Sequence, residues 1–336
     1  MIIVVICSEN IPLEVDKKDI FGYYISIMNE KFLLSTEIIN LSNKTQRLSK
    51  GCVVAVGSFD GIHKGHATLL SELVNQSNRF DLPSVVFSFA TDDGAKQSPL
   101  LADKNQKSAL LKKFGVDFLV IGNFSKFRDV SAQSFANDFL FGELGAKTII
   151  CGYDFRFGKG REGSVELLKN LFAYKGVEIH VPDVVTYDNA PISSSAIRNL
   201  IAEGDVKKAF DMLGRYYSFS AEIVHGAHLG NKLGFPTINQ NFPASMVKPK
   251  FGVYAVYVKL DGAVHMGVAN FGIKPTVGGT EPVCETHLFD FSGDCYGKTA
   301  EISFVEFLRE EKKFSSLEAL KEQVERDKEN ALSVLF

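Results

Sequence analysis

The sequence predicts two domains, a parallel α/β domain followed by an antiparallel β domain that closes with a helix. Three observations indicate this fold class: the chain length, an alternation of strand-like and helix-like segments in the first half, and a series of strand-like segments without intervening helices in the second half. A chain of 336 residues is longer than one hydrophobic core usually supports. Its 45% of apolar and 23% of charged residues are ordinary for a globular protein.

Short apolar runs alternate with helical segments in the first half of the chain. The run that begins at Cys52 is rich in valine and ends at Gly57, as buried strands commonly do. Asp103 is expected to cap a helix that Gly115 ends. Strands that alternate with helices form right-handed crossovers and a parallel sheet. The predicted strands are residues 52–57, 84–89, 117–121, 148–151 and 178–181. The predicted helices are 103–114, 131–144 and 164–174, and a further helix is indicated by the helical spacing of Leu69, Leu70, Leu73 and Val74.

The pattern changes after Ile192. Two short helical segments, 195–203 and 206–213, come first, and alternating or β-branched runs follow, separated by turn formers such as Asp261-Gly262. These runs are residues 217–224, 252–259, 264–270, 285–291 and 300–308. Strands without intervening helices predict an antiparallel barrel or sandwich.

A final amphipathic helix is predicted from a capping box, Ser315-Ser-Leu-Glu318. The residues expected on its apolar face are Leu317, Leu320, Val324, Ala331 and Leu335. We therefore divide the chain into an N-terminal extension of uncertain role (1–50), a first domain (51–200), a connecting helical segment (201–215) and a second domain (216–336). The extension is expected to form either an accessory strand and helix or a poorly ordered leader.

Charge and composition exclude several classes of partner. The formal net charge is −3 and no long run of Lys or Arg occurs, so the sequence predicts no nucleic-acid partner. No apolar stretch approaches the length of a membrane span, so no membrane partner is expected. The 5 cysteines form an odd set without a C-x-x-C pair, which fits a reducing cytoplasm.

The first motif that indicates chemistry is Gly57-Ser-Phe-Asp-Gly-Ile-His-Lys-Gly-His66, which joins the first predicted strand to the first helix. Its glycines let the backbone approach a ligand closely, and a helix N-terminus directs amide donors at an anion. His63 and His66 are three residues apart, so both rings can face the same phosphate across one helical turn. Such donors suit a transition state that gathers negative charge on phosphate oxygens.

This segment resembles the H-x-G-H signature of the nucleotidyltransferase superfamily, in the form found in bacterial bifunctional riboflavin kinase/FAD synthetases. Gly152-Tyr-Asp-Phe-Arg-Phe-Gly158 and Ile192-Ser-Ser-Ser-Ala-Ile-Arg198 resemble two further elements of that family. The resemblance implies a Rossmann-like domain that transfers the adenylyl group of ATP to FMN. It implies that His63 and His66 contact the ATP phosphates and that Arg198 stabilises the departing pyrophosphate. The other nucleotide-binding residues that it implies here are Gly57, Phe59, Asp60, Gly65, Asp154, Ser194 and Ser195.

The second motif is Gly230-Asn-Lys-Leu-Gly-Phe-Pro-Thr-Ile-Asn239, a predicted turn followed by a short strand. Gly230 and Gly234 permit close backbone approach to a phosphate. Thr237 offers a hydroxyl oxygen and Asn239 an amide oxygen, the ligand type that Mg²⁺ prefers. The motif matches neither a Walker sequence nor a protein-kinase catalytic loop.

The segment from Gly234 to Asn239 resembles the G-F-P-T-x-N signature of the riboflavin kinase domain of the same family. Other family elements follow in the right order: Gly252-Val-Tyr254, Gly267-Val-Ala-Asn270, Lys274-Pro-Thr276, Glu285-Thr-His-Leu-Phe-Asp-Phe291 and Phe307-Leu-Arg309. The resemblance implies a β-barrel in which riboflavin is phosphorylated by ATP, with Mg²⁺ on Thr237 and Asn239. It implies that Glu285 is the general base, that Gly230 and Gly234 lie at the nucleotide and that Arg309 lines the flavin site.

Two departures from the family pattern leave alternatives open. Phe89-Ala-Thr-Asp92 stands where the family commonly has Phe-x-Pro-His-Pro, and Asn231 stands where it usually has Arg. The first departure allows a riboflavin kinase with an impaired adenylyltransferase domain, and the second predicts weaker ATP binding because a planar donor fork is missing. A flavin-binding regulator without turnover is the third possibility. The retained histidine pair and Glu285 speak against it, because binding alone does not need them.

Overall fold

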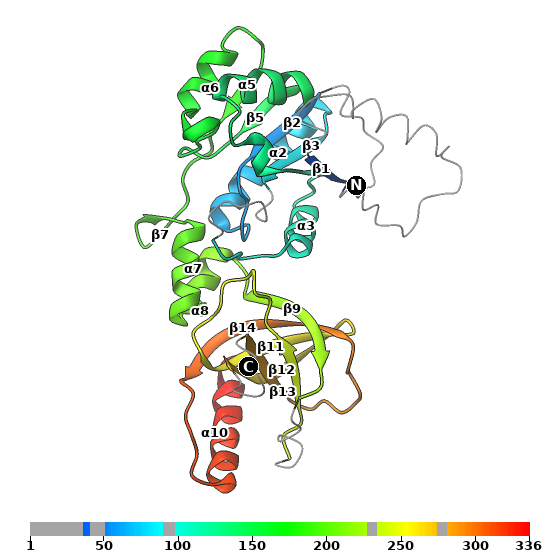
Figure 1. The fold of residues 1–336 in the computed structure, drawn as a ribbon, viewed down its shortest axis with the longest axis vertical. Helices are drawn as coiled ribbons and strands as arrows, with labels where there is room; N and C mark the ends of the chain where they lie inside the picture. Colours follow the sequence, from blue (N-terminus) through cyan, green and yellow to red (C-terminus); the bar gives the residue numbers. More distant parts are fainter. Residues whose placement is uncertain (1–35, 41–50, 90–97, 227–233, 274–280) are drawn as a thin grey trace, which may run out of the picture. The chain divides into compact units, whose positions relative to one another are not determined.

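The computed structural model describes residues 36–40, 51–89, 98–226, 234–273 and 281–336. The chain divides into two compact units (Figure 1). Unit 1 consists of Met1–Ser98 and Lys104–Pro191, and unit 2 consists of Pro99–Asp103 and Ile192–Phe336. Among the described residues, no helix combines the length and apolar character that crossing a bilayer requires.

Unit 1 is built on a six-stranded sheet with the order β1-β4-β3-β2-β5-β6. The central strands β2 (Cys52–Val56), β3 (Ser84–Phe89) and β5 (Ala146–Ile150) run parallel to one another, as do β4 (Phe118–Gly122) and β6 (Glu178–His180) at their sides. The predicted parallel α/β sheet is confirmed. The N-terminal extension adds an antiparallel edge strand, β1 (Thr36–Asn40), which pairs with β4.

Helices cover both faces of this sheet, so its strands are apolar on both sides. The helices α2 (Lys64–Phe80) and α3 (Lys104–Lys113) pack on the face that includes Val53 and Ala55. On the opposite face, Val54 and Val56 contact a core that includes the helical segment α5 (Ala132–Ser134), the π-helical η3 (Phe135–Glu143) and α6 (Val165–Phe172). The remaining short elements of unit 1 are α4 (Phe124–Phe127), η4 (Lys159–Arg161), β7 (Thr186–Tyr187) and β8 (Ala190–Pro191).

Unit 2 is a closed antiparallel barrel with the strand order β10-β13-β12-β11-β14-β9. Its strands are β9 (Tyr217–Val224), β10 (Thr237–Asn241), β11 (Gly252–Leu260), β12 (Ala263–Ile273), β13 (Pro282–Leu288) and β14 (Thr299–Arg309). Closure leaves no unpaired strand edge. Phe219, Phe271 and Phe304 are fully buried and pack together. The predicted barrel is therefore confirmed, and α7 (Ser194–Glu203) and α8 (Val206–Leu213) precede it.

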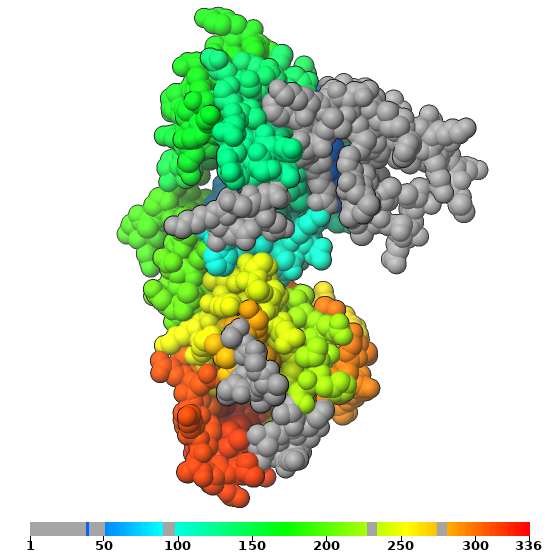
Figure 2. Space-filling model, viewed as in Figure 1, coloured from blue at the N-terminus to red at the C-terminus, as the bar shows by residue number. Residues whose placement is uncertain are grey.

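The C-terminal helix α10 (Leu317–Leu335), coloured red in Figures 1 and 2, corrects two details of the prediction. Its N-cap is Ser316, whose hydroxyl accepts the Ala319 N–H at 3.2 Å, so the expected capping box is wrong by one residue. Leu317 is 55% exposed, although it was expected on the apolar face. The buried residues are Gln323, Asp327, Ala331 and Leu335, because the first half of the helix docks through polar groups.

Candidate active sites

The candidate site of unit 1 lies where the order of strands changes direction. From β2 the chain adds β3 and β4 on one side, then returns to add β5 and β6 on the other. The loops that follow β2 and β5 therefore begin at neighbouring strand ends. Open α/β sheets bind their ligands outside the carboxyl ends of the strands at this point.

The loop between β2 and α2 has a strained backbone. Phe59 and Ile62 have left-handed φ values of 45° and 40°, although neither is glycine. Both side chains are buried, at 0% and 3% exposure. Such a conformation costs about 1–3 kcal/mol per residue and persists only where surrounding contacts enforce it, commonly at functional sites.

His63 ends this loop and begins α2. Its Nδ1 accepts the backbone N–H of His66 at 3.2 Å, so His63 is the N-cap of a helix of 17 residues. An Nδ1 that accepts a hydrogen bond carries no proton, so the ring proton lies on Nε2. The first N–H groups of a helix have no partner within the helix, which makes this end a site for an anion.

The two predicted imidazoles are brought together. The rings of His63 and His66 stack at 3.7 Å between centroids with an angle of 16° between planes. Burial is the main cause that lowers the pKa of His66 well below its ordinary 6.5, and electrostatic interactions with His63 and Lys107 lower it further. The Nδ1 atom of His66 is buried and has no hydrogen-bond partner among the described residues. The arrangement favours a neutral His66, because two cations stacked at this distance would repel each other.

Lys107 is a residue of this site that the sequence analysis missed. It projects from α3, is 8% exposed, and donates to the carbonyl oxygen of Ser58 at 2.9 Å. Burial is the main cause that lowers its pKa from 10.5, whereas Asp60 acts to raise it. The sequence contains one indication that Lys107 is buried. It lies four residues before the apolar Leu111, and residues four apart share one face of a helix.

The other predicted nucleotide-binding residues of unit 1 lie in this loop or after β5. Gly57, Phe59 and Asp60 belong to the loop, and Gly65 lies in the first turn of α2. Asp154 is exposed in the loop after β5, the strand beside β2. The structure thus brings these residues to one edge of the sheet.

Ser194, Ser195 and Arg198 lie on α7, which belongs to unit 2. The Arg198 Nε donates to the Pro99 carbonyl at 2.8 Å, also within unit 2. Their predicted role in adenylyl transfer stays a prediction.

The candidate site of unit 2 is a row of polar residues across three strands of the barrel wall. Asn239 of β10 pairs with Glu285 of β13, and Glu285 pairs with Asn270 of β12. Thr237 lies two residues before Asn239 on the same face, opposite His287. Side chains of directly paired residues share a face, with Cβ atoms about 5 Å apart. The structure therefore places the predicted base Glu285 beside the two predicted magnesium ligands.

These residues differ in exposure. Asn239 is only 5% exposed, because the chain passes directly over it at Gly226, where an added Cβ would lie 2.4 Å from the Asn239 amide nitrogen. Glu285 and Thr237 are half-buried. No cluster of three or more His, Cys, Asp or Glu residues that could hold a metal occurs in the described residues. An Mg²⁺ ion here would therefore depend on hydroxyl and amide oxygens together with substrate phosphates, as such ions commonly do.

Two further polar side chains of the barrel form bonds with named partners. Asn270, which the sequence motifs do not mark as a site residue, donates its amide to Glu311 at 3.0 Å. Arg309 lies on β14, and its guanidinium is held by the Asp327 carboxylate through bonds of 2.8 and 2.6 Å. Gly234 directly precedes the buried Phe235.

Some of the predicted features lie outside the described residues. These are Gly230, Asn231, the segment from Lys274 to Thr276 and the residues that follow Phe89.

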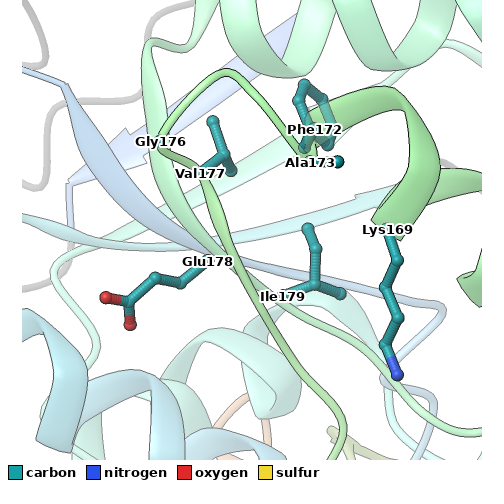
Figure 3. Close-up of a pocket in the computed structure, with 7 residues that line it drawn as sticks. All are labelled: Lys169, Phe172, Ala173, Gly176, Val177, Glu178 and Ile179. Carbon is teal, nitrogen blue, oxygen red and sulfur yellow. The ribbon is translucent and has the colours of Figure 1, made fainter.

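A separate pocket of unit 1 contains none of the predicted site residues. It has a volume of about 460 Å³ and lies beside the edge strand β6, where Figure 3 shows its lining side chains. They are Lys169, Phe172, Ala173, Gly176, Val177, Glu178 and Ile179. Glu178 is also bonded to Arg79 at 3.3 Å and His180 at 3.1 Å. The pocket is distinct from the loop of the two histidines.

Two family models match the chain, one for each kind of site. The model described as FAD synthetase matches residues 45–196, which include the loop of His63 and His66. The model described as riboflavin kinase matches residues 213–335, which include the row of Asn239 and Glu285.

Whole-chain relatives carry both names. A bifunctional riboflavin kinase/FMN adenylyltransferase of Haemophilus influenzae is 34% identical over 88% of this chain and 98% of its own length. The protein of that name from Escherichia coli strain K12 is 36% identical over 86% of this chain and 95% of its own. A crystal structure described as a macrolide-efflux protein from Streptococcus pneumoniae shares the fold, with a TM-score of 0.77 and 30% identity over 87% of this chain and 96% of its own. This chain belongs to the family of bifunctional riboflavin kinase/FMN adenylyltransferases.

Proposed function

We propose that the chain makes FMN from riboflavin and ATP in unit 2, and FAD from FMN and ATP in unit 1. The observation that carries this proposal is that each unit holds its own set of chemically suitable groups. Unit 1 places two stacked imidazoles at the N-terminus of a long helix. Unit 2 places a carboxylate beside hydroxyl and amide oxygens on a barrel wall.

In the adenylyl transfer, an oxygen of the FMN phosphate attacks the α-phosphorus of ATP, and the bond to pyrophosphate breaks. The residues bind and orient the phosphates, and no covalent intermediate with the protein is required. The Nε2–H of His63 and the amides at the start of α2 donate to oxygens on which negative charge develops. His66 stacks on His63 and shares this role. Ser194, Ser195 and Arg198 are proposed to bind the departing pyrophosphate, and Asp154 to lie at the nucleotide and flavin.

In the phosphorylation, the 5′-hydroxyl oxygen of riboflavin attacks the γ-phosphorus of ATP and ADP leaves. The Glu285 carboxylate takes the hydroxyl proton, a task for which it must lie within hydrogen-bond reach of that oxygen. Thr237 and Asn239 would hold Mg²⁺, which neutralises charge on the ATP phosphates. Gly230 and Gly234 are proposed to lie at these phosphates, and Arg309 at the flavin.

We also propose that the protein works in the cytoplasm. All 4 cysteines in the described part of the chain are free and buried, which supports a reducing compartment.

The test is to incubate the purified protein with riboflavin, ATP and Mg²⁺ and to separate the flavins by chromatography. We expect FMN to appear first and FAD to follow. Riboflavin that is retained but never converted would support a flavin-binding regulator instead. A parallel incubation with FMN and ATP tests unit 1 alone, and absence of FAD there, with FMN formation intact, would support a riboflavin kinase with an impaired second domain.

A further inference from the structure

We infer that Lys107 is a positioning residue for adenylyl transfer, whose ammonium holds the Ser58 carbonyl against the carboxyl end of β3 and thereby keeps the loop before α2 in its binding shape. The inference rests on the proposed adenylyl transfer in unit 1. It assigns a role to a residue of α3, which lies outside the motifs that indicate the reaction.

The contacts of Lys107 converge on one carbonyl group. Its Nζ donates to the Ser58 oxygen at 2.9 Å and lies 3.5 Å from the Ser88 hydroxyl. The Ser88 hydroxyl itself donates to the same Ser58 oxygen at 2.9 Å. Ser58 is the second residue of the loop after β2, and Ser88 lies near the end of β3. Two donors from different elements thus fix a peptide group near the start of the loop.

The position is one where a lysine is unusual. Lys107 and Ser88 are 8% and 1% exposed, and lysine is almost never buried unless it is paired. Packing alone would favour an apolar residue, as at Leu111 on the same face of α3. The carboxylate of Asp60, itself 4% exposed, favours the charged form of Lys107. A buried lysine between the loop and the sheet therefore indicates that its ammonium is needed as a hydrogen-bond donor to the loop, which an apolar side chain could not provide.

The loop needs such a contact because two of its residues have unfavourable backbone conformations. Ser58 directly precedes Phe59, the first of the two non-glycine residues with left-handed φ. Strained conformations of this kind persist only where neighbouring groups determine them. Without the bond to Ser58, the loop would relax, and His63 and the N-terminus of α2 would lose their alignment.

Lys107 also acts on His66 through its charge. The charged and titratable groups that act on His66 are His63 at the end of the loop and Lys107 from α3, and Asp60 acts in turn on Lys107. The positive charge of Lys107 disfavours a proton on His66. Removal of that charge should therefore let His66 take up a proton at a higher pH.

The test compares Lys107→Met with Lys112→Met, which removes an exposed lysine from the same helix. We expect kcat/KM for FAD formation from FMN and ATP to fall at least about tenfold in Lys107→Met. The acid limb of its pH–rate profile should move up by about 0.5 pH unit or more, because the neutral His66 is the active form. Riboflavin phosphorylation by the same variant should stay unchanged, as should both reactions in Lys112→Met.

The outcomes separate the inference from the proposed function. Wild-type protein that makes no FAD from FMN would remove the proposed function itself. If the wild type makes FAD and Lys107→Met is equally active with an unchanged acid limb, the role of Lys107 alone is overturned. An equal loss of both reactions in Lys107→Met would overturn it as well, because such a loss indicates general destabilisation. If Lys107→Met does not fold, the same assays are carried out with Lys107→Gln, which keeps an N–H donor but removes the charge. The expected shift of the acid limb is the same.

Discussion

His63 uses the two nitrogens of its ring for different purposes. Nδ1 accepts the His66 N–H and so caps α2, while Nε2 carries the proton that the proposed reaction would use to bind a phosphate. A capping side chain contributes to stability, and a donor aimed at developing charge contributes to rate. Substitutions at this residue can separate the two contributions.

His63→Ala removes both contributions, whereas His63→Ser keeps a side-chain oxygen that can cap the helix. We expect His63→Ala to lose about 1 kcal/mol of unfolding free energy and most FAD formation. His63→Ser should lose FAD formation to the same degree but remain close to wild type in stability. Urea denaturation and the FMN-to-FAD assay measure the two effects. A fully active His63→Ser would show that the imidazole is dispensable.

The lowered pKa of His66 predicts a pH dependence of stability. Between its folded pKa and about 6.5, the unfolded chain binds a proton that the folded protein does not. Stability from the neutral ring is therefore complete above about pH 6.5 and is lost as the pH falls below it, by up to about 1.4 kcal/mol per pH unit. Denaturation curves at several pH values should show this acid loss in wild type and a smaller one in His66→Gln. Equal slopes in the two proteins would contradict the prediction.

The residues of the site differ in how far the sequence could predict them. The stacked histidines are three residues apart on a recognisable motif, so their proximity follows from helix geometry. Asn239 and Glu285 could be named only by resemblance, because their pairing depends on strand register. Lys107 could not be named as a functional residue, because its partner Ser58 lies 49 residues away in sequence and meets it only in the folded domain.

Among the elements, α10 shows how a polar contact decides where a helix docks. Its Asp327 is 3% exposed and binds Arg309 of β14 in a two-bond arrangement, with Gln323 donating to the same carboxylate at 2.8 Å. The apolar part of the interface begins only at Ala331 and Leu335. This explains why the apolar face expected from the sequence begins too early.

Removal of one partner of this ion pair should be costly. We expect Asp327→Ala to lose about 3 kcal/mol of unfolding free energy, because it leaves the guanidinium without its carboxylate. The double variant Arg309→Met/Asp327→Leu should lose less than the single one. Lys298→Ala, which breaks an exposed pair with Asp261, serves as the control and should lose under about 1 kcal/mol. A double variant that loses as much unfolding free energy as Asp327→Ala, or more, would contradict a coupled pair.

The loop after β5 offers a matched pair of glycines. Gly158 and Gly160 have left-handed φ values of 74° and 61°. A Cβ at Gly158 would lie 2.5 Å from the backbone nitrogen of Ala132, whereas a Cβ at Gly160 would meet nothing within 4 Å. Both positions have a positive φ, but they differ in ψ, which is 177° at Gly158 and 15° at Gly160, and in steric space.

Alanine substitutions should reflect that difference. Gly160→Ala should cost about 1 kcal/mol from the left-handed backbone alone. Gly158→Ala should cost about 1–3 kcal/mol more, through overpacking and through a backbone conformation open almost only to glycine, with reduced FAD formation and normal FMN formation. Denaturation of the two variants and both product assays check this. Equal losses at the two positions would contradict a special cost at Gly158 from its backbone conformation and its contact with Ala132.

The elements themselves were largely predictable from periodicity. Residues 84–89 form β3 as expected, and residues 206–213 form α8. The expected helix at 131–144 is split into a short α-helix and a π-helix, a distinction that side-chain pattern does not encode. The edge strand β1 is not predictable from the sequence alone, because its formation depends on pairing with β4.

At the scale of the whole molecule, two units each have their own core and their own candidate site. The sheet of unit 1 is packed on both faces by helices, and the barrel of unit 2 closes on itself. The two reactions share FMN, as the product of one and the substrate of the other. Because each site is built from residues of a different motif set, loss of one reaction should leave the other intact.

That independence can be measured with the variants His66→Ala and Glu285→Ala, assayed separately and as an equal mixture with riboflavin, ATP and Mg²⁺. We expect His66→Ala to make FMN without FAD, and Glu285→Ala to make FAD only when FMN is supplied. The mixture should convert riboflavin to FAD, since FMN released by one variant can be used by the other. If either substitution silences both reactions in a protein with a normal denaturation curve, the account of two separate sites is contradicted.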